Sequence, residues 1–207
     1  MQITHSKDGT SIAYETTGSG PLLIIITGAL NTHNFGVPGD MVPFLQESFS
    51  VLTYDRRGRG ESGDTPPYAI EKEIEDLEAL IDANGGKVYL YGHSAGAALA
   101  LFTAAALPEK VLKVAAYEPP LSGGWLESAA TNLMIRQFQN QVNKGNNLSV
   151  VTRFMRFVGM DEQLIKDTLA SEHGPTIVAM AGTIGYEAEI QKASKSFLTT
   201  RASDDPA

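Results

Sequence analysis

One short motif constrains the fold of this chain more than any other stretch. The apolar residues Val88-Tyr89-Leu90-Tyr91 lead into Gly92-His93-Ser94-Ala95-Gly96, and an alanine-rich run follows directly. This order predicts a strand, a sharp turn and a helix, with the hydroxyl of Ser94 exposed on the turn. A serine on so tight a turn has strained backbone angles, and small residues two positions away let strand and helix approach closely. The alternative, an ordinary glycine-rich turn with an incidental serine, is disfavoured by the flanking strand and helix.

Strands and helices alternate through the first 120 residues. The run 22–27 is apolar on both faces, which is typical of a central strand covered by helices on both sides. Residues 3–5 and 11–16 predict a β-hairpin around the turn 7–10. The pattern as a whole predicts a doubly wound, mostly parallel sheet of the α/β class. Its further strands are expected over residues 51–54, 88–91 and 111–117, and its helices over 37–47, 70–83 and from Ser94 to Leu107.

The character of the sequence changes after Pro120. Helical patterns follow one another with no convincing strand between them, over residues 125–142, 148–158, 161–171 and 176–193. Successive helices after a strand of an α/β sheet predict an all-helical cap over the carboxyl edge of that sheet. The expected organisation is therefore a core over residues 1–120, a helical cap over 121–198 and a flexible tail over 199–207.

Composition excludes several classes of protein. The chain has 207 residues and a formal charge of −8, which argues against a surface for nucleic acid, because phosphate binding needs a basic face. It has no cysteine, so there is no disulfide, thiolate metal site or cysteine nucleophile. No stretch reaches the roughly 18 apolar residues that span a bilayer, and the N-terminus lacks a secretory pattern. We expect a cytoplasmic protein that needs no membrane, metal or organic cofactor.

Two further stretches support the motif around Ser94. A polar, glycine-rich loop, Asp55-Arg56-Arg57-Gly58-Arg59-Gly60-Glu61-Ser62, follows a buried strand, and Thr27-Gly28-Ala29 follows the long apolar strand. With these three features the chain resembles the α/β-hydrolase superfamily, in particular its cap-bearing serine hydrolases. Members usually have histidine where Thr27 stands, a departure that affects packing beneath the oxyanion site. We expect the arginines of the loop to be architectural and to pair with carboxylates on nearby loops.

The resemblance implies a mechanism. Ser94 would be the nucleophile of an acyl transfer, and the backbone N–H groups of Ala29 and Ala95 would form the oxyanion hole, with Gly28 and His93 at the binding site. The implied substrate is a small, fairly apolar ester. Lactonases, C–C bond hydrolases and perhydrolases share these residues, whereas dehalogenases and epoxide hydrolases use an aspartate in place of the serine. Apolar cap residues fit either a pocket lining or a helix core: Leu133, Met134, Phe138, Phe154, Met155 and Phe157.

The family's catalytic acid and histidine have no matching position in this chain, because the two strands that precede them are absent from it. Of the four histidines, His5 lies in the first strand, and the side chain of His93 should diverge from Ser94. His33 and His173 are weak candidates at the rim of the pocket. Glu118, directly after a strand, is a weak candidate for the acid. We therefore expect a base from residues outside this chain or from a partner chain.

The same absence predicts an interaction surface. Residues 111–117 would form the edge of the sheet with unpaired backbone groups, an arrangement that proteins normally cover or charge. We expect self-association or pairing with another chain through this strand. The competing hypothesis for function is a non-catalytic protein with a hydrolase fold, which binds a small molecule or a partner and lacks a triad.

Overall fold

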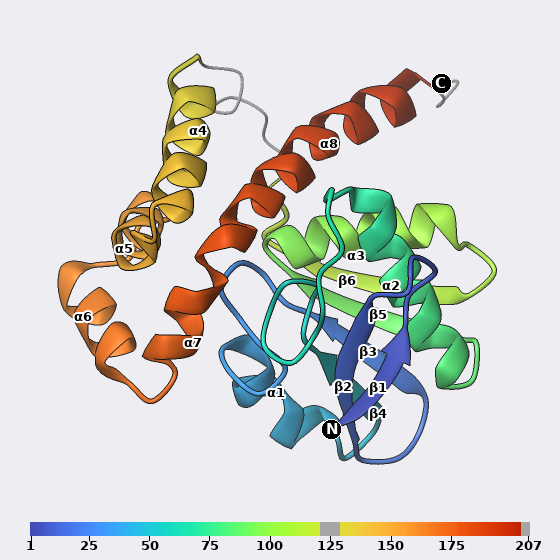
Figure 1. The fold of residues 1–207 in the computed structure, drawn as a ribbon. Coiled ribbons are helices and arrows are strands. Elements are labelled where there is room, and N and C mark those ends of the chain that lie inside the picture. Colours follow the sequence, from blue (N-terminus) through green and yellow to red (C-terminus); the bar gives the residue numbers. More distant parts are fainter. Residues whose placement is uncertain (121–128, 204–207) are drawn as a thin grey trace.

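The computed structural model describes the backbone of residues 1–120 and 129–203, and the side chains of residues 1–120 and 136–194. Six strands form one sheet in the order β1-β2-β4-β3-β5-β6 (Figure 1). The first two form the predicted antiparallel hairpin, and β4, β3, β5 and β6 run parallel. The mostly parallel α/β sheet expected from the sequence is confirmed. Its strands are β1 (Gln2–His5), β2 (Ser11–Thr17), β3 (Leu22–Ile26), β4 (Ser50–Tyr54), β5 (Val88–His93) and β6 (Val111–Tyr117).

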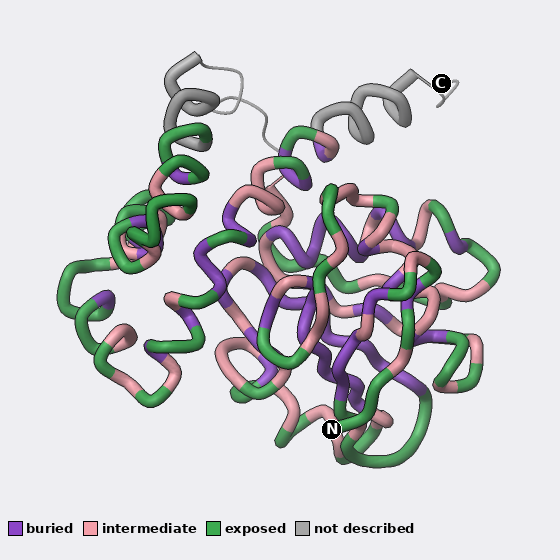
Figure 2. The backbone as a smooth tube through the Cα atoms, viewed as in Figure 1, coloured by how far each residue is buried: buried purple, intermediate pink, exposed green. Residues whose placement is uncertain are grey.

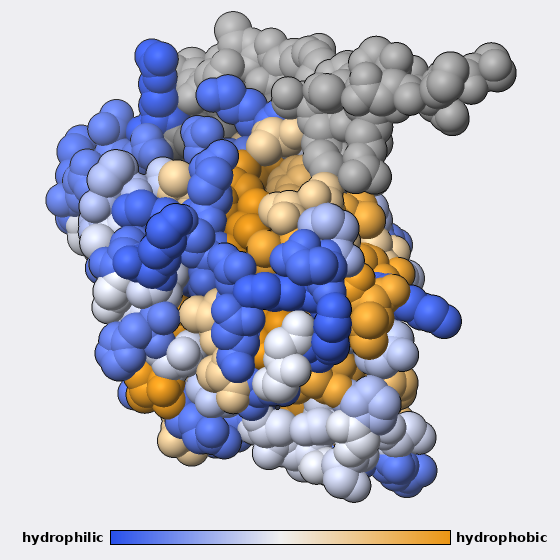
Figure 3. All heavy atoms as spheres, turned by 90° about the vertical axis from the view of Figure 1, so that its right-hand side faces the viewer, coloured by the Kyte–Doolittle hydropathy of each residue, from blue (hydrophilic) through white to orange (hydrophobic). Residues whose placement is uncertain are grey.

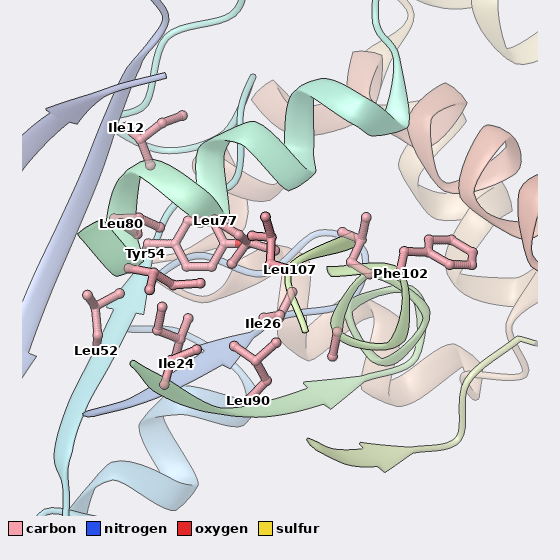
Figure 4. Packing of buried hydrophobic residues seen from close by; sticks show 14 of the residues in the cluster. Ile12, Ile24, Ile26, Leu52, Tyr54, Leu77, Leu80, Leu90, Phe102 and Leu107 are labelled. Carbon is pink, nitrogen blue, oxygen red and sulfur yellow. The ribbon is translucent and has the colours of Figure 1, made fainter. Parts of the chain in front are cut away.

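Helices cover the sheet on both faces. Every residue of β3 is buried, as the unbroken apolar run predicts for a central parallel strand. Ile24 and Ile26 belong to the core beneath α2 (Ile70–Ala83) and α3 (Ala95–Ala106), together with Leu77 and Leu90 (Figure 4). Leu23, on the opposite face, lies near α1 (Val37–Leu45).

The helix α2 has the predicted bounds and an unexpected inner face. Leu77, Leu80 and Ile81 are buried at helical spacing, as the amphipathic pattern predicts. Glu73 and Asp76 are buried as well. Two carboxylates inside a helix–sheet interface need partners, and the buried arginines described below supply them.

All described elements after β6 are helical, and we call residues 129–203 the helical region. We call residues 1–120 the sheet domain. A second hydrophobic core joins Leu30 of the sheet domain to Phe138, Val151, Met155 and Ile177. In Figure 2 the outer sides of this region are largely exposed, whereas buried residues concentrate in the sheet. The region contains α4 (Ala129–Asn143), α5 (Asn147–Phe157), α6 (Glu162–Ala170), α7 (Gly174–Ala179), the 3₁₀ turn η1 (Met180–Thr183) and α8 (Ile184–Ser203).

Two expectations for this region were wrong in detail. The single helix predicted over residues 176–193 is interrupted by η1, a break that buries Met180 and Ala181 in the second core. The last helix, α8, also continues beyond the predicted end at residue 193 to Ser203, because no glycine or proline before Pro206 ends it. The start of the predicted helix at residues 125–128, and residues 204–207, lie outside the described part. None of the helices that the structure describes is both long and apolar enough to cross a membrane.

The strand β6 forms an open edge of the sheet, as expected. Within the described part of the chain it pairs with β5 alone, and most of its residues are exposed, including Leu112 and Tyr117. A shallow apolar depression continues from this strand across the face that carries α1, and it is lined by Phe49, Tyr89 and Val114 among others. Figure 3 shows one face of the molecule, where hydrophobic side chains reach the surface between hydrophilic ones.

Candidate active site

The turn that carries Ser94 has the geometry that its sequence predicts. Ser94 lies between β5 and α3 with φ 54° and ψ −125°, a strained conformation for a residue with a side chain. A Cβ atom on Gly92 would come within 2.3 Å of the Gly96 carbonyl oxygen, and one on Gly96 within 2.1 Å of the Ile26 carbonyl oxygen. Both positions therefore require glycine, because strand and helix touch backbone to backbone.

Two backbone N–H groups beside Ser94 are free to bind an anion. Ala95 is the first residue of α3, so its N–H has no partner within the helix and points along the positive end of the helix dipole. Ala29 follows β3 in a loop that packs against Ser94, since a Cβ on Gly28 would lie 3.1 Å from the Ser94 Cβ. Among the residues that the structure describes, neither N–H donates a hydrogen bond. Both residues line the cavity at Ser94.

Two cavities meet at Ser94. The first has a volume of about 320 Å³ and extends beneath α4, α5 and α8, with aromatic walls from Phe138, Phe154 and Phe157. The second, of about 430 Å³, lies toward β6 and α6 and is lined by Met155, Met160 and Phe35 among others. Phe154 borders both cavities. Volumes of this size and mostly apolar walls suit small organic molecules.

The described residues of the helical region that were expected to line a pocket do so, and some also belong to the core. Phe138 and Met155 are nearly fully buried in the second hydrophobic core, and each also borders one of the cavities. These two residues therefore both line a cavity and pack in the core of the helices, the two roles that the sequence left open. The side chains of Leu133 and Met134 lie outside the described residues.

His93 and Glu118 share the second cavity with Ser94. The sequence led us to expect that His93 diverges from the serine, yet both line the same space. Its ring stacks on Tyr117, and its buried Nδ1 atom has no hydrogen-bond partner. Burial lowers the pKa of His93, and the charge of Glu118 opposes this shift without cancelling it. Glu118 follows β6 with a positive φ of 49°, at the strand end next to Ser94.

The remaining histidines are engaged elsewhere. The backbone N–H of His33 donates to the buried carboxylate of Asp55 at 2.7 Å, and its ring Nδ1 lies 3.0 Å from the same oxygen. His173 stacks on Phe35 at 4.7 Å between ring centres. His5 is exposed on β1. Among the described side chains, no histidine forms a hydrogen bond with Ser94.

The arginines of the loop 55–62 are buried and paired, which agrees with an architectural role. Arg57 binds Asp76 through two hydrogen bonds of 2.8 and 2.7 Å. Arg56 binds Glu73 in the same manner. Burial alone would raise the pKa of the Glu73 carboxyl, but the guanidinium of Arg56 holds that pKa below its usual range. Glu73 and Asp76 lie on α2, beneath which the loop packs. Arg57 also binds Asp8, on the turn between β1 and β2, at 3.1 Å, so the expected pairing with a carboxylate on a nearby loop is found for this arginine.

Two polar residues of the site, Glu187 and Gln191, are not predicted from the sequence. Both lie on α8 and line the first cavity beside Ser94. Glu187 binds the guanidinium groups of Arg56 and Arg59. The sequence contains no local signal for this contact, because α2 already carries more acidic residues than the loop has arginines. Over the part of the chain that the structure describes, no cluster of three histidine, aspartate or glutamate residues could hold a metal ion.

Comparison with known proteins gives a consistent result. The family model for the alpha/beta hydrolase fold matches residues 21–204. A crystal structure of an alpha/beta hydrolase from Sphaerobacter thermophilus is 38% identical with a TM-score of 0.80, over 91% of this chain and 73% of that one. The uncharacterized hydrolase YraK of Bacillus subtilis is 27% identical over 210 residues, which cover 93% of this chain and 72% of YraK.

A shorter similarity links the chain to the lipase LipV of Mycobacterium tuberculosis. The two are 36% identical over 73 residues, which cover 35% of this chain and 28% of the lipase. The family match and the likeness to the Sphaerobacter protein both span nearly the whole chain. On these grounds, together with the strained serine between β5 and α3, the chain belongs to the alpha/beta hydrolase fold family and is related to hydrolases.

Proposed function

We propose that the protein is a serine hydrolase that cleaves small, largely apolar carboxylic esters through an acyl-Ser94 intermediate. The observation that carries the proposal is the strained Ser94, which borders two mostly apolar cavities beside two unpaired backbone N–H groups. The oxygen of Ser94 would attack the ester carbonyl, and the N–H groups of Ala29 and Ala95 would stabilise the resulting oxyanion. The alcohol would then leave, and water would release the acid from the serine.

The two cavities support a substrate with two organic arms. An ester has an acyl group on one side of its carbonyl carbon and an alkoxy group on the other, and the cavities of about 320 and 430 Å³ extend from Ser94 in different directions. Each volume is at the lower end of the range for ligand pockets. The helical region supplies the aromatic wall that would act as the roof of the site.

A serine hydroxyl needs a general base at neutral pH. Because no described histidine is bound to Ser94, we infer that a histidine outside this chain supplies the base. His93 is the alternative within the described site, since its neutral ring borders the second cavity. A cytoplasmic location stays a prediction.

The test is the intact mass after incubation with a fluorophosphonate. We expect one adduct per chain, which disappears in Ser94→Ala, because an activated serine displaces the fluoride. The same adduct in His93→Gln at an unchanged rate would favour a base outside the chain. Absence of an adduct on folded protein would contradict the proposal.

The second candidate function is a non-catalytic binding protein. The observation in its favour is that the hydroxyl of Ser94 has no hydrogen-bond partner among the described residues. This alternative predicts that no adduct forms, while a small ester still protects the protein against thermal unfolding. Ester binding without any turnover or labelling would make this function the better one.

A further inference from the structure

Three successive carbonyl groups of the loop beside Ser94 accept hydrogen bonds from side chains. Arg56 Nη1 donates to the Thr27 oxygen at 3.3 Å, and Arg59 Nη1 donates to the Gly28 oxygen at 2.6 Å. Asn31 Nδ2 donates to the Ala29 oxygen at 2.6 Å. The orientation of successive peptide groups after β3 is therefore set by polar side chains, not by the strand alone.

One of these contacts bears on the oxyanion site. The Gly28 carbonyl and the Ala29 N–H belong to the same peptide group, which is trans, so they point in opposite directions. The hydrogen bond from Arg59 keeps the Gly28 oxygen pointing toward the buried arginines. The N–H of Ala29 is thereby turned away from them, and Ala29 borders the cavity at Ser94.

Arg59 is in turn held by the helical region. Its Nη2 donates to Glu187 Oε1 on α8, and Arg56 Nη1 shares that oxygen at 3.1 Å. All three side chains are at least nine-tenths buried. Burial and the positive charge of Arg56 lower the pKa of Arg59, and the charge of Glu187 opposes them. The negative charge of Glu187 thus balances the positive charge of the Arg59 guanidinium, which would otherwise be buried beside Arg56.

The same helix forms a wall of the first cavity. Ile184, Glu187, Ala188 and Gln191 all line this space, at the spacing of one helical face. Any molecule in the cavity therefore lies against the face of α8 that also holds Arg59. Glu187 on α8 borders the cavity and binds Arg59. Arg59 in turn donates to the Gly28 carbonyl, which belongs to the same peptide group as the Ala29 N–H.

We propose that Arg59 and Glu187 are positioning residues for the Ala29 N–H, and that they couple the placement of α8 to the oxyanion site. The catalytic consequence rests on the proposed function, whereas the orientation of the Ala29 peptide does not. Arg59 touches no reacting atom and acts through the Gly28 carbonyl. Glu187 acts one step further away, through the guanidinium of Arg59.

The decisive measurement is the amide resonance of Ala29 in ¹H–¹⁵N spectra, with its hydrogen-exchange rate. In Glu187→Ala we expect this resonance to shift and its exchange to accelerate, because Arg59 loses its anchor. Glu187→Gln should largely restore both, since the amide oxygen still accepts from Arg59. The matched control is Glu189→Ala, an exposed carboxylate on the same helix, which should change neither.

Labelling by the fluorophosphonate gives the functional readout. Loss of one oxyanion donor typically lowers turnover by roughly 10²–10³-fold, and a misplaced donor should slow labelling by about tenfold in Glu187→Ala. If the unmodified protein is not labelled, the proposed function fails, yet the Ala29 resonance still decides the inference. If Glu187→Ala does not fold, Glu187→Asp is the second variant. Its side chain is one methylene shorter, so the carboxylate moves away from Arg59 and the Ala29 amide resonance should shift. An unchanged Ala29 amide in a folded variant of either kind would overturn the proposal.

Discussion

The sheet domain and the helical region satisfy their charged and apolar groups in different ways. In the sheet domain, Arg56 and Arg57 are buried and paired with the buried carboxylates of α2, and Arg59 binds Glu187 across the boundary to the helical region. In the helical region, the pair of Arg156 and Glu162 is exposed, and a mainly apolar cluster holds the helices together. A buried charge without its partner is strongly destabilising, whereas an exposed pair contributes little.

The backbone shows the same difference. Gly92 and Gly96 lie where no side chain fits, but a Cβ on Gly182 of the helical region would meet no atom within 4 Å. The sheet domain therefore places Ser94 through contacts that tolerate little change. The helical region shapes the cavity with side chains that can vary. We expect substrate preference to change more readily through the helical region than through the sheet.

The largest effect should come from the buried ion pairs. Glu73→Gln leaves the fully buried Arg56 without one of its charged partners, so the free energy of unfolding should fall by about 3–5 kcal/mol. Glu162→Gln in the exposed pair should leave the denaturation midpoint unchanged within error. Urea unfolding of both variants measures the contrast. Similar denaturation midpoints for the two variants would contradict the contrast between the buried and the exposed ion pairs.

The glycines should give the next effect. Gly96→Ala forces a methyl group against the Ile26 carbonyl and should lower the free energy of unfolding by about 3 kcal/mol. Gly182→Ala should be neutral or stabilise by up to about 1 kcal/mol, because alanine favours a helical backbone and space is free. Thermal unfolding of the matched pair is the measurement. A stable Gly96→Ala protein would show that strand and helix can separate.

The smallest effect concerns the open edge of the sheet. We propose that two copies of the chain pair through β6, because its apolar edge has no neighbour in the described structure. Leu112→Lys, at a position 51% exposed on β6, should weaken association in sedimentation experiments. Leu164→Lys, at a position 48% exposed on α6, should leave it unchanged. A protein that stays monomeric at high concentration would contradict the pairing.

The local features of the site were predictable from the sequence. The turn at Ser94 depends on two glycines within four residues and on the strand and helix that flank it. The central strand β3 follows from an unbroken apolar run, and α2 from an apolar pattern at helical spacing. Short-range sterics and periodicity determine such features, so they can be recognised without knowledge of the rest of the fold.

The tertiary structure alone decided how distant groups meet. Glu187 lies 128 residues after Arg59, and within α8 it resembles any acidic residue of an exposed helical face. The break at η1 and the contact of His33 with Asp55 likewise arise from packing between separate segments. The sequence by itself determined where Ser94 stands and which backbone groups surround it. Only the fold decided which charges orient those groups, because the pairing of buried charges depends on contacts between elements far apart in the chain.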